Sequence, residues 1–358
     1  MAVSAITERQ KKRLMMKIKN LIVLLPMALM TGCTKEDVSE CAVEIRFEYE
    51  YNTARVDKFT SDIHKLTLFV FNEAGDLVRE LPMEGNNFPD NYRIRTKLDA
   101  GKYSFVAWGE MNNDMPHDRG TSGRLSESFL RLRTGGSATT GYTVETTGVD
   151  PVEWDKGASY PHNIYYGASG ENNEGSGTIT QVEVKHPSNQ KVLISMVKDT
   201  KSIRVNFNGL PMSSANKDYF YCRITAANSE YDFYNRLVGN KTVTYIPQVY
   251  TTPASSGAAH DAKQTNDFVT MRLFGDNSCQ SQLTLIYQAP ASSPVTILNT
   301  PLTELIKSTY TSPAVDFVRD DVFELNFNYD GDYTFTNYTI TAGGWTHVSG
   351  TGGTGGFL

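Results

Sequence analysis

Cys33 is the residue whose surroundings most clearly indicate a covalent modification. It lies within the stretch LLPMALMTGCTKED, residues 24–37, where an apolar run from Leu21 to Met30 gives way to polar residues. A membrane-spanning helix needs about 20 apolar residues, so this run is too short to cross a bilayer. Basic residues precede it: Arg9, Lys11, Lys12, Arg13, Lys17 and Lys19. This order is typical of a secretory signal peptide that ends near Cys33.

The residues Met30-Thr31-Gly32-Cys33 resemble the bacterial lipobox, in which an apolar residue lies three positions before the cysteine and glycine lies just before it. The resemblance implies that Cys33 receives a diacylglycerol on its sulfur and becomes the mature N-terminus. An ordinary signal peptide that happens to end near a cysteine is the alternative. Met16 is a normal signal-peptide start, so residues 1–15 are interpreted as upstream reading frame. Residues 1–32 are therefore left out of the predicted fold.

Residues 33–41 form the predicted lipidated tether. Lys35, Glu36 and Asp37 resemble the export signal of surface lipoproteins in Bacteroidales-type bacteria, which carry a lysine and two acids after the lipidated cysteine. The resemblance predicts exposure at the cell surface. A lipoprotein on the periplasmic face would also have a polar tether here, and this alternative remains open.

Net charge limits the partners of the mature chain. The whole chain carries −6, and residues 1–32 contribute six basic residues and one acid, or +5, so the mature part carries −11. This balance predicts no direct attraction to nucleic acid or anionic lipid. Contact with the outer membrane is instead expected through the acyl chains on Cys33, and no other cofactor or metal is expected.

Three further cysteines share strand parity with apolar neighbours: Cys41, Cys222 and Cys279. Their pattern is that of small buried hydrophobic residues. A disulfide between Cys222 and Cys279 is the alternative in an oxidising compartment.

Alternating hydrophobicity predicts an all-β fold. In residues 42–51, Val43, Ile45, Phe47, Tyr49 and Tyr51 alternate with charged residues, so one face of a strand is buried. Further strands are predicted at 65–72, 77–81, 92–98, 102–108, 164–168, 181–185, 190–199, 202–207, 219–226, 241–245, 268–274, 282–288, 322–329 and 333–340. Short helices are predicted around 125–132 and at 300–309, where Thr300 is the cap and Pro301 the first helical residue. Residues 255–267 are predicted to form a polar loop.

Short strands joined by hairpin turns favour antiparallel β-sandwiches. The strands fall into two blocks, which predicts an N-terminal domain at 42–190 and a C-terminal domain at 200–346. The boundary is expected within 186–201. Residues 347–358 are predicted to be a Gly-rich tail without structure of its own.

The ordered series of segments resembles the fimbrillin-associated anchor proteins of Bacteroidales-type fimbriae. The first block carries it in VEIRFEYEYN, IHKLTLFVFNEAGDLV and LDAGKYSFVAWGEMN, and the second in VKDTKSIRVNFNGLP and ITAANSEYDFYNRLVGNKTVTYIPQV. The resemblance extends from Cys33 to about Trp345. It implies two tandem transthyretin-like sandwiches in a protein that holds a fimbrial shaft at the outer membrane and ends its growth.

The resemblance also implies a mechanism. Shaft subunits of such fimbriae lose a long N-terminal stretch to an arginine-directed protease, and the open groove then accepts a strand of the next subunit. Here only nine residues, 33–41, precede the first strand, and the first arginine after Cys33 is Arg46 in the middle of that strand. A cut there would sever the lipid. We therefore predict that the first strand is retained and closes the groove.

Other patterns give weaker indications of chemistry. The six histidines are scattered (His64, His117, His162, His186, His260 and His347), and HExxH, CxxC, GxSxG and GxxxxGK[ST] motifs are absent, so no enzyme is expected. The series Asn326, Asn328, Asp330, Gly331 mimics the start of a calcium loop, but the twelfth position is Asn337 and an Asp-Gly hairpin explains the series better. Trp108 and Trp345 end strands, where core packing is commoner than sugar binding.

Two functions remain for the mature chain. The first is the base subunit of a fimbria, lipid-anchored and monomeric before it meets shaft subunits. The alternative is a surface lipoprotein adhesin, or a fimbrial tip subunit, that contacts host or glycan through exposed loops.

Overall fold

The computed structural model describes residues 42–85, 88–111, 117–118, 123–131, 142–144, 163–170, 178–185, 190–239, 242–253, 261–309, 314–331, 333–342 and 345–351. Most elements in this part of the chain are strands, and the helices are short, which confirms the all-β prediction. None of the helices among these residues is long and apolar enough to be a membrane span.

The first block folds into one eight-stranded sheet. Its strands are β1 (Ala42–Glu48), β2 (Lys65–Asn72), β3 (Leu77–Glu84), β4 (Arg93–Lys97), β5 (Gly101–Gly109), β9 (Tyr165–Ser169), β10 (Val182–Val184) and β11 (Lys191–Lys198). The order is β3-β2-β5-β9-β11-β1-β4, and β10 pairs with β5. A single helical turn, α2 (Phe59–Asp62), follows β1 and buries Phe59. Because β11 belongs to this sheet, the first block continues past residue 190 to Lys198.

The second block contains two sheets. The six-stranded sheet has the order β16 (Gln248–Thr252), β17 (Lys263–Met271), β12 (Thr200–Asn208), β20 (Val322–Tyr329), β21 (Phe335–Ala342), β22 (Trp345–Thr351). The five-stranded sheet has the order β19 (Val295–Pro301), β18 (Gln282–Tyr287), β13 (Phe220–Ala226), β15 (Val243–Tyr245), β8 (Tyr142–Val144). Apolar side chains of both sheets, such as Phe207 and Leu285, share one core.

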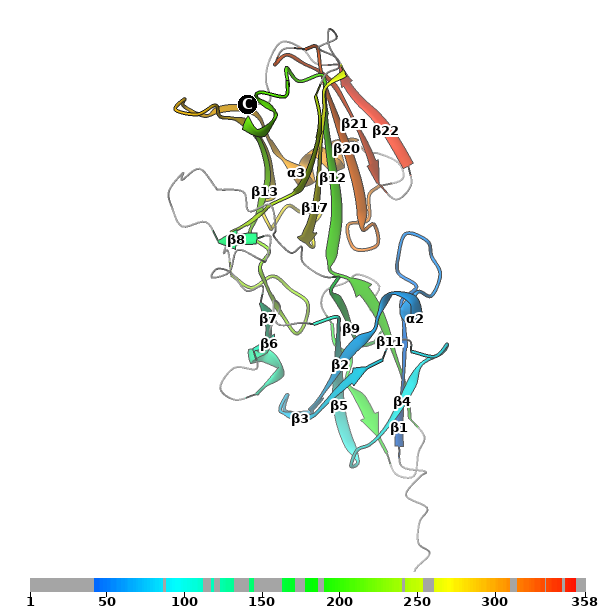
Figure 1. Ribbon diagram of the computed structural model, residues 1–358. Coiled ribbons are helices and arrows are strands. Elements are labelled where there is room, and N and C mark those ends of the chain that lie inside the picture. Colours follow the sequence, from blue (N-terminus) through cyan, green and yellow to red (C-terminus); the bar gives the residue numbers. More distant parts are fainter. Residues whose placement is uncertain are drawn as a thin grey trace, which may run out of the picture.

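Segments of the first block reach into the second. A small sheet joins β6 (His117–Asp118) and β7 (Phe129–Arg131) of the first block to β14 (Glu230–Asp232) of the second, and β8 pairs with β15. The turn after β14 places Phe233 on the first sheet, where its ring centroid lies 4.9 Å from that of Phe69 and 6.1 Å from that of Trp108. The two blocks therefore share a continuous core, and Figure 1 shows them stacked end to end.

One residue connects the two large sheets. Asp199 alone separates β11 from β12, and it is fully buried. Its Oδ1 lies 3.5 Å from Nη1 of Arg272, which is also buried, and accepts a hydrogen bond from Nδ2 of Asn235 at 3.1 Å. Burial raises the pKa of the Asp199 carboxyl, and the Arg272 guanidinium opposes this rise. Nearby, burial lowers the pKa of Lys201 to about 8, and its Nζ donates to the carbonyl of Val318 at 2.9 Å.

Several predicted elements differ from the structure. The helix predicted around 125–132 is a single 3-10 turn, η2 (Leu125–Glu127), and then β7, because pairing with β14 extends the chain. The prediction of a loop at 255–267 was wrong for its last five residues, because β17 begins at Lys263, which pairs with Asn208. The predicted tail begins as part of β22, which pairs with β21 as far as Thr351. A 3-10 turn, η3 (Lys217–Tyr219), precedes β13.

The helix predicted at 300–309 is α3 (Leu302–Thr309), which begins one residue after the predicted first helical residue, Pro301. Pro301 is the last residue of β19 rather than the first of the helix. Ser281 takes the role expected of a cap, because its carbonyl accepts from the amide of Leu302 at 2.9 Å and its Oγ accepts from that of Thr303 at 3.1 Å.

Candidate functional site

The first strand is built into the middle of a sheet. β1 pairs in parallel with β11 and antiparallel with β4, so both of its edges are occupied. Val43, Ile45 and Phe47 expose 1% or less of their surface and pack in the core on one face of the sheet. The alternation in residues 43–47 thus predicted the buried face correctly. Both neighbours of β1 in the sheet are therefore strands of the same chain.

The predicted strand 42–51 ends early, at Glu48. The amide of Tyr49 donates to Oδ1 of Asp57 at 3.0 Å, and Nδ2 of Asn52 donates to the carbonyl of Tyr49 at 2.6 Å, so these bonds replace the strand ladder. Tyr49 remains buried, whereas Tyr51 is half-buried and its hydroxyl donates to Asp316 of the second block. The end of β1 is therefore fixed to both blocks.

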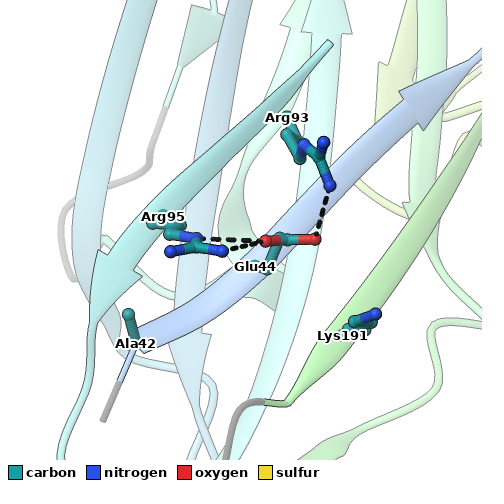
Figure 2. Close-up of a pocket in the computed structure, with 5 residues that line it drawn as sticks. All are labelled: Ala42, Glu44, Arg93, Arg95 and Lys191. Carbon is teal, nitrogen blue, oxygen red and sulfur yellow. Dashed lines mark hydrogen bonds and ion pairs between the residues drawn. The ribbon is translucent and has the colours of Figure 1, made fainter. Parts of the chain in front are cut away.

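The opposite face of β1 is charged. Figure 2 shows Glu44 of β1 between Arg93 and Arg95 of β4, with Lys191 of β11 on the other side and Ala42 at the start of the strand. Oε2 of Glu44 accepts from Nη2 and Nε of Arg95 at 2.8 and 3.0 Å, and Oε1 accepts from Nη1 of Arg93 at 3.3 Å. These bonds, Arg95 first, lower the pKa of the Glu44 carboxyl. The side chains line a hollow of about 270 Å³.

The residues predicted for lipidation and export lie outside the described residues: Cys33, Lys35, Glu36 and Asp37. Cys41 also lies outside them. Cys222 and Cys279 are both buried as free thiols, so the small-hydrophobe interpretation holds for them and the alternative disulfide is not formed.

The other residues considered for chemistry have structural roles where they are described. Trp108 is fully buried, with its ring 5.0 Å from that of Tyr166. Asn326 and Asn328 lie in β20 and accept hydrogen bonds from Asn206 and Asn208 of β12, so the calcium-like series is part of a strand and its hairpin. In the described part of the chain, no three His, Cys, Asp or Glu side chains are grouped as a metal site.

Comparison with protein families identifies the family to which this sequence belongs. The family of fimbrillin-A associated anchor proteins Mfa1 and Mfa2 matches residues 36–350. The chain belongs to this family. The match includes both blocks and the strand β1, and it confirms the resemblance drawn from the ordered segments.

Individual relatives agree with the assignment. The chain is 26% identical over 118 residues to the major fimbrium anchoring subunit FimB of Porphyromonas gingivalis. This alignment covers 32% of the present chain and 39% of FimB. The sequence match therefore spans well under half of the length of FimB.

Solved structures share the fold over nearly their whole length. The fimbrial anchor protein Mfa2 of Porphyromonas gingivalis has a TM-score of 0.61 at 16% identity, with 86% of this chain and 99% of that chain covered. A candidate polysaccharide-binding protein of Bacteroides thetaiotaomicron has a TM-score of 0.65 at 19% identity, with 87% and 98% covered. A candidate adhesin of the same species has a TM-score of 0.64 at 21% identity, with 86% and 97% covered. At these identities the likeness shows the fold alone.

The charged groups of this anchor-family chain were not predicted from its sequence. Arg93, Arg95 and Lys97 alternate with Ile94 and Thr96, and this period-2 spacing of basic residues was the available signal for one charged strand face. The burial of Asp199 and Arg272 had no comparable signal, since it depends on contacts between the two blocks.

Proposed function

We propose that the chain is an outer-membrane lipoprotein that holds a fimbrial shaft at the cell surface and ends its growth with the retained strand β1. The observation that carries the proposal is the position of β1 between β11 and β4, with its apolar side chains buried. Membership of the anchor family supports the fimbrial role. Shaft subunits are the expected partners, and the base of the fimbrium is the expected location.

Chain termination follows from the occupied position of β1. Strand addition needs a vacant edge with unpaired backbone groups and an open apolar groove. A subunit whose own first strand fills both offers no acceptor at this place. Because only residues 34–41 separate the strand from Cys33, the lipid and the closing strand belong to one short segment.

Cys33→Ala is expected to block signal-peptide processing and lipid attachment, because the lipobox requires the cysteine sulfur. The measurement is metabolic labelling with a radioactive fatty acid, followed by gel analysis of the precursor and mature forms. Cys222→Ala is the matched control, since its thiol is buried in the fold. Continued labelling of the Cys33→Ala protein would contradict the assignment.

Replacement of Lys35, Glu36 and Asp37 by alanine is expected to leave the protein lipidated and folded but to retain it on the periplasmic side. The three residues are polar and precede the first strand in the sequence, so their replacement is not expected to affect folding. Protease shaving of intact cells measures exposure, and lysed cells serve as the control. Equal shaving of the variant and the wild type would show that these residues are not the export signal.

An adhesin or fimbrial tip subunit is the rival function. The similar folds of a candidate adhesin and a candidate polysaccharide-binding protein favour it. Electron microscopy with gold-labelled antibodies separates the two functions: label at the shaft base supports the anchor, and label at the free end supports the tip subunit.

A further inference from the structure

The exposed face of β4, β1 and β11 carries a local excess of positive charge. Five basic side chains point to this side and are named here the basic face: Arg46, Arg93, Arg95, Lys97 and Lys191. Arg93 and Arg95 bond Glu44, yet their side chains remain 62% and 70% exposed. The acidic side chains of the same strands are Glu44 and Glu48, which are only 13% and 16% exposed.

Two lysines of the basic face are placed differently from its arginines. Lys97 lies opposite Ala42 and Lys191 lies beside Glu44 in the register, so both border the start of β1. Both are exposed, and no carboxylate of a described residue lies within ion-pair distance of either amine. Within the described part of the chain, no ion pair offsets their charges.

The charge of the basic face opposes that of the remaining protein. Five basic and two acidic side chains give this face +3, whereas the mature chain as a whole carries −11, which leaves −14 for the rest. A negatively charged surface would attract the basic face and repel the other sides of the molecule. The expectation drawn from net charge alone did not take this separation into account.

The basic face lies where the tether begins. Ala42 is the first residue of β1, and Figure 1 shows β1 and β4 at the end of the molecule away from the six-stranded sheet. Nine residues, 33–41, reach at most about 30 Å when fully extended. If Cys33 is lipidated, as in the proposed function, the basic face is held close to the headgroups of the membrane that contains its acyl chains.

We propose that the basic face binds the phosphates of anionic lipid headgroups and orients the protein on its membrane. Guanidinium and ammonium groups bind phosphate oxygens through charge-assisted hydrogen bonds. A single acyl attachment fixes distance but not orientation, and the basic face supplies a second contact at the same end of the molecule.

The test uses residues 34–358, which contain every described residue and lack Cys33, so its result does not depend on lipidation. Co-sedimentation is measured with vesicles of phosphatidylcholine alone and of phosphatidylcholine with phosphatidylglycerol. We expect binding only to the anionic vesicles, and release at high salt because charge attraction is screened within about 10 Å at 0.1 M salt.

Lys97→Glu with Lys191→Glu is expected to weaken this binding at least about twentyfold, since each basic residue near an anionic surface contributes about fivefold. The matched control is Lys217→Glu with Lys263→Glu, which makes the same change in net charge on the second block. Thermal unfolding checks each fold, and Lys97→Gln with Lys191→Gln replaces the first variant if it is unstable. The proposal would be overturned if the basic-face variant and the control variant bound the anionic vesicles equally well. It would also be overturned if the wild type bound both kinds of vesicle equally. Failed lipidation at Cys33 would contradict only the proposed function.

Discussion

Removal of the chain up to Arg46 is expected to turn a monomer into oligomers or a precipitate. The cut deletes Val43 and Ile45, and burial of each side chain stabilises the fold by about 1.5–3 kcal/mol. It also removes all five register pairs between β1 and β4. Since folded domains are stable by only about 5–15 kcal/mol, the first block should lose β4 and expose its core.

An edge freed in this way is a template for strand addition. Residues 47–358 should therefore capture strands from other copies, whereas residues 34–358 should elute as a monomer in size-exclusion chromatography. Residues 42–358 provide the matched control, because they lack the tether but keep the whole of β1. A stable monomeric 47–358, or polymerisation of the intact form, would show that β1 does not close the groove. The adhesin function would then gain support.

Arg272→Met is expected to lower the free energy of unfolding by about 3–5 kcal/mol, because it leaves the buried Asp199 carboxylate without its cation. Without Arg272, the folded-state pKa of Asp199 rises further above its unfolded value. The folded state then binds more protons than the unfolded state, so the stability of the variant should fall as the pH rises from acid toward neutral. Urea unfolding at several pH values measures both effects.

Two controls separate this effect from a general loss of charge. Arg204→Met breaks the Arg204–Asp267 pair, whose side chains are 53% and 29% exposed, and should cost less than about 1 kcal/mol. Asp199→Asn combined with Arg272→Met removes both buried charges and should recover much of the stability. If Arg272→Met and Arg204→Met are equally mild, the buried pair does not hold the junction between the sheets.

Prediction from sequence succeeded where a strand has one buried and one exposed face or a long apolar run. The strands at 65–72 and 322–329 have the predicted bounds, as β2 and β20. Both are bounded on at least one side by turn residues, and their branched and aromatic side chains favour extended backbone. The buried positions of β1 were identified for the same reason.

Prediction failed where the structure depends on contacts distant in sequence. β14 and β16 have only three and five residues, so neither contains an alternating pattern long enough to be recognised as a strand. The pairing of β7 with β14 joins residues about 100 positions apart, which no local pattern encodes. The basic face was missed for a related reason, since it gathers side chains from three strands whose order in the sheet differs from their order in the chain.

The parallel pairing of β1 with β11 has a mechanical consequence. Tension between a lipid at Cys33 and a shaft on the second block would pull β1 toward its N-terminus and β11 toward its C-terminus, since β11 continues through Asp199 into β12. Strands pulled in this way slide along each other, so their hydrogen bonds share the load and must break together. A hairpin pulled apart at its open ends would instead lose its hydrogen bonds one at a time. Under the proposed function, the β1–β11 pair would thus be loaded in shear, the direction in which a strand pair resists force best.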